Sequence, residues 1–317
     1  MQVDPNLMLT AWLISASLQM ATPLILAALG GMFSERSGIV NIALEGIMLI
    51  GAFSAVAATF FTNNPWFGVL VATGAGGLIA LIHAIITVKY KGNHIVSGTG
   101  ILLFAAGFTT LMLQVIWNRK GYSESVTQLP EVSIDALTGN DFIDAALNNH
   151  SPITFIAFIM VIASWYILYR TPFGLRIRAS GEDPSTLDTA GVNVGWIRVL
   201  GVVISGLLAG MAGAYLSIGF GSAFGKLMTS GKGFIALAAL IFGNWTPGGV
   251  LGAGLFFGFL EGLQYAIQLA PGFAWLEQYT AFVQVIPYVL VVLALAGIRK
   301  SRAPKAIAIP YEKEKKT

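Results

Sequence analysis

Long apolar stretches dominate the chain, and few charged positions interrupt them. A helix that spans a bilayer needs about 20 mostly apolar residues, and helices or closed barrels are the structures that satisfy their own backbone there. The pattern therefore predicts one all-α domain over 1–317, a polytopic membrane bundle of about 8–10 helices. The expected spans are 7–30, 39–61, 66–88, 95–117, 152–169, 199–218, 248–270 and 281–298.

One further apolar stretch, 234–243, is too short to cross a membrane alone and follows the glycine-rich segment 219–233. Irregular backbone at membrane depth is tolerated where it is buried in protein or lines a cavity. We therefore expect a broken or re-entrant element near 219–243, with an ordinary loop as the alternative. Phe220 and Phe224 of this segment offer aromatic faces on which a flat ligand can stack.

Composition supports the membrane assignment. The chain is 56% hydrophobic and 10% charged, with a mean hydropathy of +0.75. Soluble proteins have about 25% charged residues, so this chain has too few to cover a water-exposed surface. A cytosolic enzyme and a nucleic-acid binder are thereby excluded. The chain has no cysteine, which excludes disulfides and thiolate metal sites.

The distribution of Lys and Arg predicts an orientation. If the chain crosses the membrane nine times, 14 of the 18 Lys and Arg residues lie on one side of it. The side that is richer in Lys and Arg is normally cytoplasmic. The N-terminus is then outside and the C-terminus inside. The loop 118–151 is extracytoplasmic, with a net charge of 2 − 5 = −3. The basic tail 299–317 is expected to act as a cytoplasmic anchor.

The cytoplasmic loop 170–198 contains a short predicted helix. Asp183 suits the N-cap, Pro184 the first helical position and Gly191 the C-terminal stop, which predicts a helix over 184–190. The acidic Glu182 and Asp183 favour its positive end. Leu187 lies within it. Such a helix either packs on the membrane base of its own chain or docks a cytoplasmic partner.

Two carboxylates fall inside predicted spans. Glu45 follows Asn41 by one turn, and Glu261 precedes Gln264 on the same helix face. Charges at membrane depth are costly, and they usually face a translocation path or a partner group. Glu45 and Glu261 are therefore either path residues or a structural lock between helices. In an ion-coupled secondary transporter, which is an alternative interpretation, they would carry protons or cations.

No catalytic pattern is present. The segment 225–232 fails the phosphate-binding pattern G-x-x-x-x-G-K-[ST], and neither H-E-x-x-H nor G-x-S-x-G occurs. The histidines His83, His94 and His150 are dispersed. We therefore expect no catalytic residue, metal or cofactor in this chain and reject a membrane-embedded enzyme. If transport is driven by ATP, a separate polypeptide hydrolyses it.

Four motifs occur in an order that resembles a known family. The chain is similar to the permeases of branched-chain amino acid/ribose-type ABC importers, and within them to the nucleoside (guanosine)/simple-sugar branch. The resemblance covers about 25 to 298. The motifs are GMFSERSGIVNIALEGIMLIGAF (31–53), HIVSGTGI (94–101), FGLRIRASGEDPSTLDTAGVNV (173–194) and GKGFIALAALIFGNWTPGGVLGAG (231–254).

This resemblance implies partners and a cargo. A family member lies in the bacterial cell membrane and pairs with a second homologous permease. It docks ABC ATPase subunits that use ATP and Mg²⁺. It receives its substrate from an extracytoplasmic binding lipoprotein; the implied substrate is a nucleoside, such as the purine nucleoside guanosine, with simple sugars as the alternative.

The resemblance also implies positions for function. The stretch 173–194 matches the family's ATPase-coupling loop, and Asn41 and Glu45 match the first motif without an assigned role. From the polar and aromatic residues themselves, and not from the resemblance, we expect a translocation path that includes Asn41, Glu45, Phe220, Phe224, Glu261 and Gln264. The expected coupling residues are Gly174, Arg178, Gly181, Glu182, Asp183, Pro184, Leu187 and Gly191.

Overall fold

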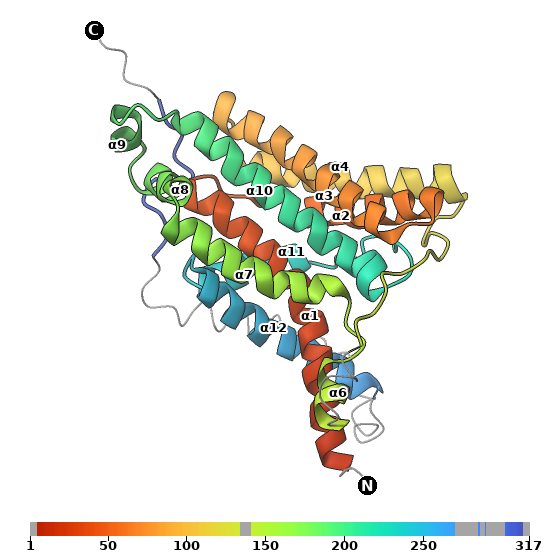
Figure 1. The fold of residues 1–317 in the computed structure, drawn as a ribbon. Coiled ribbons are helices and arrows are strands. Elements are labelled where there is room, and N and C mark those ends of the chain that lie inside the picture. Colours follow the sequence, from red (N-terminus) through yellow and green to blue (C-terminus); the bar gives the residue numbers. More distant parts are fainter. Residues whose placement is uncertain (1–4, 134–140, 270–284, 286–288, 290–301, 313–317) are drawn as a thin grey trace.

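The fold is a helical membrane bundle (Figure 1). The computed structural model describes residues 5–133, 141–269, 285, 289 and 302–312. Six helices in these ranges are long and apolar enough to cross a membrane, which confirms the predicted class. They are α1 (Pro5–Arg36), α2 (Leu44–Thr62), α3 (Pro65–Ala84) with η1 (Ile85–Lys89), α4 (His94–Trp117), α7 (Pro152–Arg170), and α10 (Val194–Ala214) with η2 (Tyr215–Phe220).

The remaining helices are of several lengths. Helix α12 (Pro247–Leu269) has 23 residues, and α11 (Lys232–Phe242) has 11. Short helices α6 (Asp141–Leu147), α8 (Pro172–Glu182) and α9 (Pro184–Thr189) connect the longer ones. The expected span 281–298 lies outside the described residues, apart from two isolated positions.

Local chemistry sets many of the helix ends. Helices α3, α7, α8 and α9 each begin at a proline, whose fixed φ and missing N–H suit the first helical position. Asn93 caps α4 by accepting hydrogen bonds from the Ile95 and Val96 amides at 2.9 and 3.2 Å. Asn63 and Asn118 end α2 and α4 in the left-handed conformation, which asparagine tolerates better than most residues.

The first two helices differ from the predicted spans. Helix α1 continues to Arg36, and α2 begins at Leu44 rather than near 39. The intervening residues form a turn, because Gly38 adopts a φ of +102° and the Ser34 hydroxyl donates to the Ile39 carbonyl at 2.7 Å. A hydrophobicity window does not detect this turn, since apolar residues flank it on both sides.

Helix α10 packs closely against α2 and α3, and α1 packs against α10 and α12. Glycine makes the close approach possible. A Cβ added at Gly76 on α3 would lie 2.3 Å from the Gly206 carbonyl oxygen, and one at Gly213 would lie 2.1 Å from that of Met48. Small residues are the usual means of bringing membrane helices into contact.

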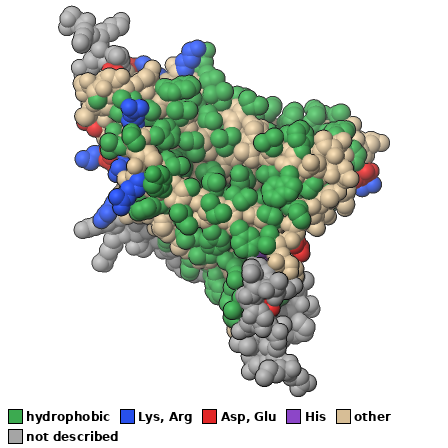
Figure 2. All heavy atoms as spheres, in the orientation of Figure 1, with side chains coloured by type: hydrophobic (Ala, Val, Ile, Leu, Met, Phe, Trp, Pro, Cys, Tyr) green, Lys and Arg blue, Asp and Glu red, His purple; other side chains and the backbone are tan. Residues whose placement is uncertain are grey.

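The two ends of the bundle differ in charge. Helices α8 and α9 lie together at one end, beside the described tail residues 302–312 (Figure 1). Lys and Arg side chains gather there, whereas hydrophobic side chains cover the middle of the same face (Figure 2). We call this end, formed by α8, α9 and residues 302–312, the basic end.

The loop 170–198 contains more structure than the sequence predicted. One helix over 184–190 was expected, but α8 precedes it. Helix α8 lacks a long apolar run and turns directly out of α7. Gly174 permits this corner, because a Cβ there would lie 2.0 Å from the Ile167 carbonyl oxygen.

Candidate functional site

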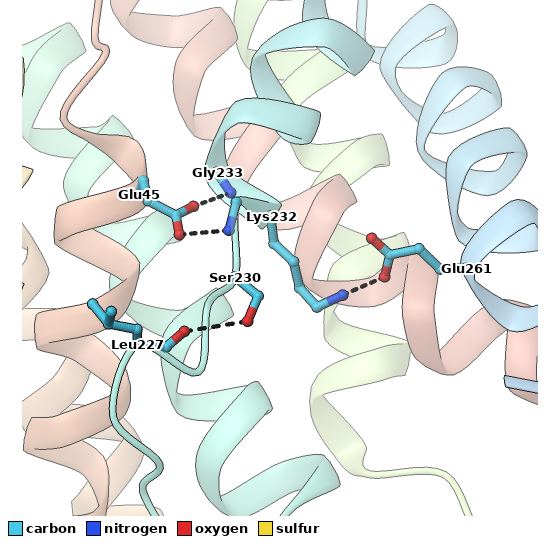
Figure 3. Close-up of polar contacts among 7 residues, drawn as sticks. Glu45, Leu227, Ser230, Lys232, Gly233 and Glu261 are labelled. Carbon is cyan, nitrogen blue, oxygen red and sulfur yellow. Dashed lines mark hydrogen bonds and ion pairs between the residues drawn. The ribbon is translucent and has the colours of Figure 1, made fainter. Parts of the chain in front are cut away.

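The N-terminus of α11 is held by a carboxylate from another helix. Glu45, in the first turn of α2, accepts hydrogen bonds from the backbone amides of Gly231 at 2.8 Å and Gly233 at 2.6 Å (Figure 3). The side chain is 5% exposed. Free amides at a helix N-terminus favour an anion, so Glu45 occupies the place where α11 would otherwise attract one.

Both residues whose amides bond Glu45 need to be glycine. Gly231 has a φ of +85°, which L-residues with a side chain rarely adopt. A Cβ on Gly233 would lie 2.5 Å from the Glu45 backbone nitrogen. The motif residues at 45, 231 and 233 therefore form one contact between α2 and α11.

A second carboxylate holds the same turn. Lys232, the first residue of α11, forms an ion pair with Glu261 on α12 (Figure 3). The side chains are 17% and 10% exposed. Glu45 and Glu261 thus bind the start of α11 from opposite sides (Figure 3). We call the group formed by Glu45, residues 231–233 and Glu261 the α11 collar. Both carboxylates are engaged, as expected of a structural lock between helices.

The predicted broken element is confirmed at this place. Helix η2 ends at Phe220, residues 221–231 are irregular, and α11 begins at Lys232. The loop that follows α4 holds the irregular segment in place through backbone hydrogen bonds. The amides of Ser123 and Val126 donate to the carbonyls of Phe224 and Ser222 at 2.9 and 2.7 Å.

The other proposed path residues have different surroundings. Phe224 is buried, and its ring meets Phe53 edge-on at 5.4 Å, so its face is used in packing. Phe220 is 37% exposed. Asn41 donates to the Ser205 hydroxyl at 2.9 Å between α10 and the α1–α2 turn. Gln264 lies partly buried on α12, one turn after Glu261.

The predicted short helix forms at the basic end. Asp183 accepts hydrogen bonds from the Ser185 and Thr186 amides at 3.1 and 3.3 Å and from both of their hydroxyls. These bonds, the Ser185 hydroxyl first, lower the pKa of Asp183 to about 2. Gly191 ends the helix with a φ of +79°.

Leu187, one of the expected coupling residues, faces the bundle. Leu187 is 6% exposed and packs against its own chain, so it seats α9 on the bundle. The exposed residues Ser185, Thr186 and Thr189 form the outer surface of α9. A short helix turns one face inward, and the sequence alone did not indicate which face.

The other matched positions of this loop lie on α8, which positions α9. Gly174 forms the corner with α7, and a Cβ on Gly181 would lie 2.3 Å from the Arg36 carbonyl oxygen. The Arg178 guanidinium lies 5.1 Å from the centre of the Tyr169 ring, in cation–π contact. Glu182 is exposed. Because they contain the positions expected to couple to an ATPase, we call α8 and α9 together the coupling arm.

Sequence reasoning missed a buried arginine behind this arm. Arg198 is 2% exposed, and it donates to the carbonyls of Ile309 at 2.9 Å and Ser180 at 3.4 Å. The Ala306 amide also donates to the Gly181 carbonyl at 2.8 Å. The described part of the tail, 302–312, is thus bonded to the coupling arm. The expectation of a simple basic anchor missed this bonding, because the partners are backbone atoms without a sequence signature.

Two of the histidines that are dispersed in the sequence contact the backbone of the same residue, Val40. His83 contacts the Val40 carbonyl through Nε2 at 3.1 Å, and the Val40 amide donates to Nδ1 of His94 at 3.2 Å. His150 remains apart, near Ser15. Among the described residues there is no group of three or more His, Asp or Glu side chains that could hold a metal ion.

Comparison with known proteins identifies the class. Residues 13–295 match the family described as "Branched-chain amino acid transport system / permease component". The chain therefore belongs to this family of transport permeases and is a multi-pass membrane protein. No solved structure shows significant similarity to it.

Individual relatives are similar along most of the chain. The guanosine ABC transporter permease protein NupQ of Bacillus subtilis (strain 168) is 40% identical over 96% of this chain and 97% of its own length. The nucleoside ABC transporter permease protein NupC of Lactococcus lactis subsp. cremoris (strain MG1363) is 38% identical over 93% and 95%. The putative glucose ABC transporter permease protein TsgC13 of Haloferax volcanii is 36% identical over 81% and 78%.

Proposed function

We propose that this chain is a permease subunit of an ATP-driven importer of nucleosides, with guanosine as a representative cargo. Nearly full-length similarity to two nucleoside permeases supports the substrate class. A separate ATPase subunit supplies the energy, a second homologous permease completes the path, and an extracytoplasmic lipoprotein delivers the cargo. The chain itself makes no bond in the substrate.

The coupling arm is the observation that carries this proposal. Helix α9 lies beyond the spans, is capped at both ends, and exposes Ser185, Thr186 and Thr189. Helix α8, Leu187 and Arg198 fix its position on the bundle. A movement imposed on α9 by a docked ATPase would therefore reach α7 and α10, since α8 follows α7 after one residue and α10 follows α9 after four.

Co-purification tests the docking. The tagged chain is isolated from its native membranes in mild detergent, and its companions are identified by mass spectrometry. We expect an ABC ATPase, a second permease and a lipoprotein. Thr189→Arg on α9 should remove the ATPase and abolish guanosine uptake, whereas Ser125→Arg, also exposed but at the other end, should retain the ATPase. Normal ATPase recovery and uptake with Thr189→Arg would contradict the docking role.

A competition assay tests which class of substrate the importer transports. Uptake of labelled guanosine by cells that express the complete importer should be inhibited by an excess of other nucleosides and not by glucose. Inhibition by glucose alone would assign the importer to simple sugars.

The proposed orientation places the basic end in the cytoplasm. The absence of cysteine permits clean labelling of single introduced cysteines. In intact cells a membrane-impermeant maleimide should label Ser125→Cys, and it should label Thr189→Cys only after the membrane is opened. The reverse pattern would overturn the orientation.

A further inference from the structure

The turn between α11 and α12 has a strained backbone. Asn244 and Trp245 have φ values of +53° and +54°, and a bulky residue such as tryptophan rarely adopts this left-handed conformation. The turn lies beside the tail, because the Arg302 amide donates to Asn244 Oδ1 at 2.7 Å. Strain of this kind persists only where the surroundings impose it, and it clusters at functional sites. The contacts of Trp245 therefore show what holds the turn.

Two consecutive residues at the end of α1 hold Trp245. Its indole N–H donates to the Glu35 carboxyl group at 2.5 Å, and Arg36 Nε donates to its carbonyl at 2.8 Å. Trp245 is 4% exposed and Glu35 is 5% exposed. A hydrogen bond shielded from water in this way is electrostatically stronger than an exposed one. The end of α1 and the α11–α12 turn are therefore joined by two polar contacts.

The end of α1 also contacts the coupling arm. A Cβ on Gly181 of α8 would lie 2.3 Å from the Arg36 carbonyl oxygen, so the two backbones touch. One residue further on, the Ser180 hydroxyl donates to the Ser37 carbonyl at 2.9 Å, and both serines are fully buried. Arg36 therefore meets the coupling arm with its backbone and the α11–α12 turn with its side chain.

Helix α11 connects this turn to the α11 collar. The Trp245 amide donates to the Leu240 carbonyl at 3.2 Å, so the turn is bonded to the last residues of the helix. Helix α11 has 11 residues, and at 1.5 Å per residue it is about 16 Å long. Its other end is the collar, where the irregular segment 221–231 stops. A displacement of Trp245 along the helix axis would therefore reach the collar.

We propose that Glu35 and Arg36 are positioning residues that transmit movement of the coupling arm to α11 through Trp245. We call these three residues the α1 relay. The inference rests on the proposed function, in which an ATPase moves the arm. Along the chain, α10, η2 and the irregular segment separate α9 from α11, whereas Arg36 contacts both α8 and the turn directly. The relay makes the broken element respond to the ATPase.

The complete importer in proteoliposomes tests the relay, with ATP hydrolysis and uptake of labelled guanosine measured on the same sample. Trp245→Phe removes the indole donor, and Glu35→Leu removes its acceptor. Either variant should retain the ATPase on co-purification and hydrolyse ATP. Each should transport at least about fivefold less guanosine per ATP, which is the lower end of ordinary coupling between sites. A merely structural defect would lower hydrolysis and uptake together and leave their ratio unchanged.

Matched variants separate the hydrogen bond from packing. Trp117→Phe is the same change at a residue that is 7% exposed, and its indole nitrogen has no hydrogen-bond partner among the described residues. This variant should keep the normal ratio of guanosine to ATP. Glu35→Gln retains an acceptor oxygen for the indole and should also keep it. The double variant Glu35→Leu/Trp245→Phe should be no worse than either single variant, because both remove one interaction.

The outcomes separate the relay from the proposed function. A normal ratio in Trp245→Phe would overturn the relay, and this variant decides alone if Glu35→Leu is not recovered as a folded protein. An equal fall with Trp117→Phe, or a Glu35→Gln variant as defective as Glu35→Leu, would also overturn it. Failure of the unsubstituted chain to recover an ATPase would contradict the proposed function, and the relay with it.

Discussion

The α11 collar gives the sharpest test of how the broken element is held. Glu45→Gln keeps the size of the side chain but removes its charge and one of its two acceptor oxygens. The Gln amide can accept from one of the Gly231 and Gly233 amides, and its NH₂ group then faces the other. A buried, unsatisfied N–H costs about 1–3 kcal/mol. Loss of the negative charge at a helix N-terminus adds about 0.3–1 kcal/mol, up to about 2 when buried.

Together these costs predict that Glu45→Gln lowers the free energy of unfolding by about 2–4 kcal/mol. The assay is thermal unfolding of the full-length chain in one fixed detergent. With about 2–4 °C per kcal/mol for larger domains, the midpoint should fall by at least about 4 °C. Substrate preference should change little, because the carboxylate is fully engaged by backbone amides.

Two matched variants make the result interpretable. Glu124→Gln is the same chemical change at an exposed residue whose contact with Arg119 is 3.8 Å long, and its effect should stay within about 0.5 kcal/mol. Gly233→Ala perturbs the Glu45 contact from α11, since its Cβ would meet the Glu45 backbone. The two perturbations should be non-additive. An unchanged midpoint for Glu45→Gln together with altered cargo selection would refute the lock and place Glu45 on the path.

Three further outcomes follow from other contacts. Lys232→Met should destabilise the chain more than the double variant Lys232→Met/Glu261→Gln, because the single variant leaves a mostly buried carboxylate unpaired; additive melting shifts would contradict this. The pKa of Asp183 lies below its ordinary value of 3.8, so its capping stability is present above that value and lost only as the pH falls towards about 2. Amide exchange of α9 should therefore show constant protection between about pH 5 and 8, and a pH-dependent loss within that window would refute the cap. Arg198→Met should speed proteolytic cleavage within 302–312, and unchanged cleavage would show that the arginine does not hold the tail.

Much of the architecture could be predicted from local sequence. Runs of about 20 apolar residues gave the spans, because backbone in lipid must satisfy its own hydrogen bonds. Asp183, Pro184 and Gly191 gave α9, because capping depends on residues next to the helix end. The break near 219–243 followed from a glycine-rich segment beside an apolar run that is too short to cross.

The errors have a common physical origin. Helix α8 was missed because its start depends on a close contact between Gly174 and α7. Leu187 was expected among the coupling residues, and the sequence did not indicate that it faces the bundle, because which side of α9 is buried depends on the helices beneath it.

The sequence by itself determined that the chain is a helical membrane protein, where its polar residues lie along the chain, and which short helix is capped beyond the spans, since each depends on neighbouring residues. The tertiary structure decided what those polar residues do. Glu45 meets Gly231 and Gly233 across 186 and 188 positions, and Arg198 meets Ile309 across 111. Backbone amides and carbonyls are the same at every residue, so only the packing of the helices selects which of them a distant charge will bind.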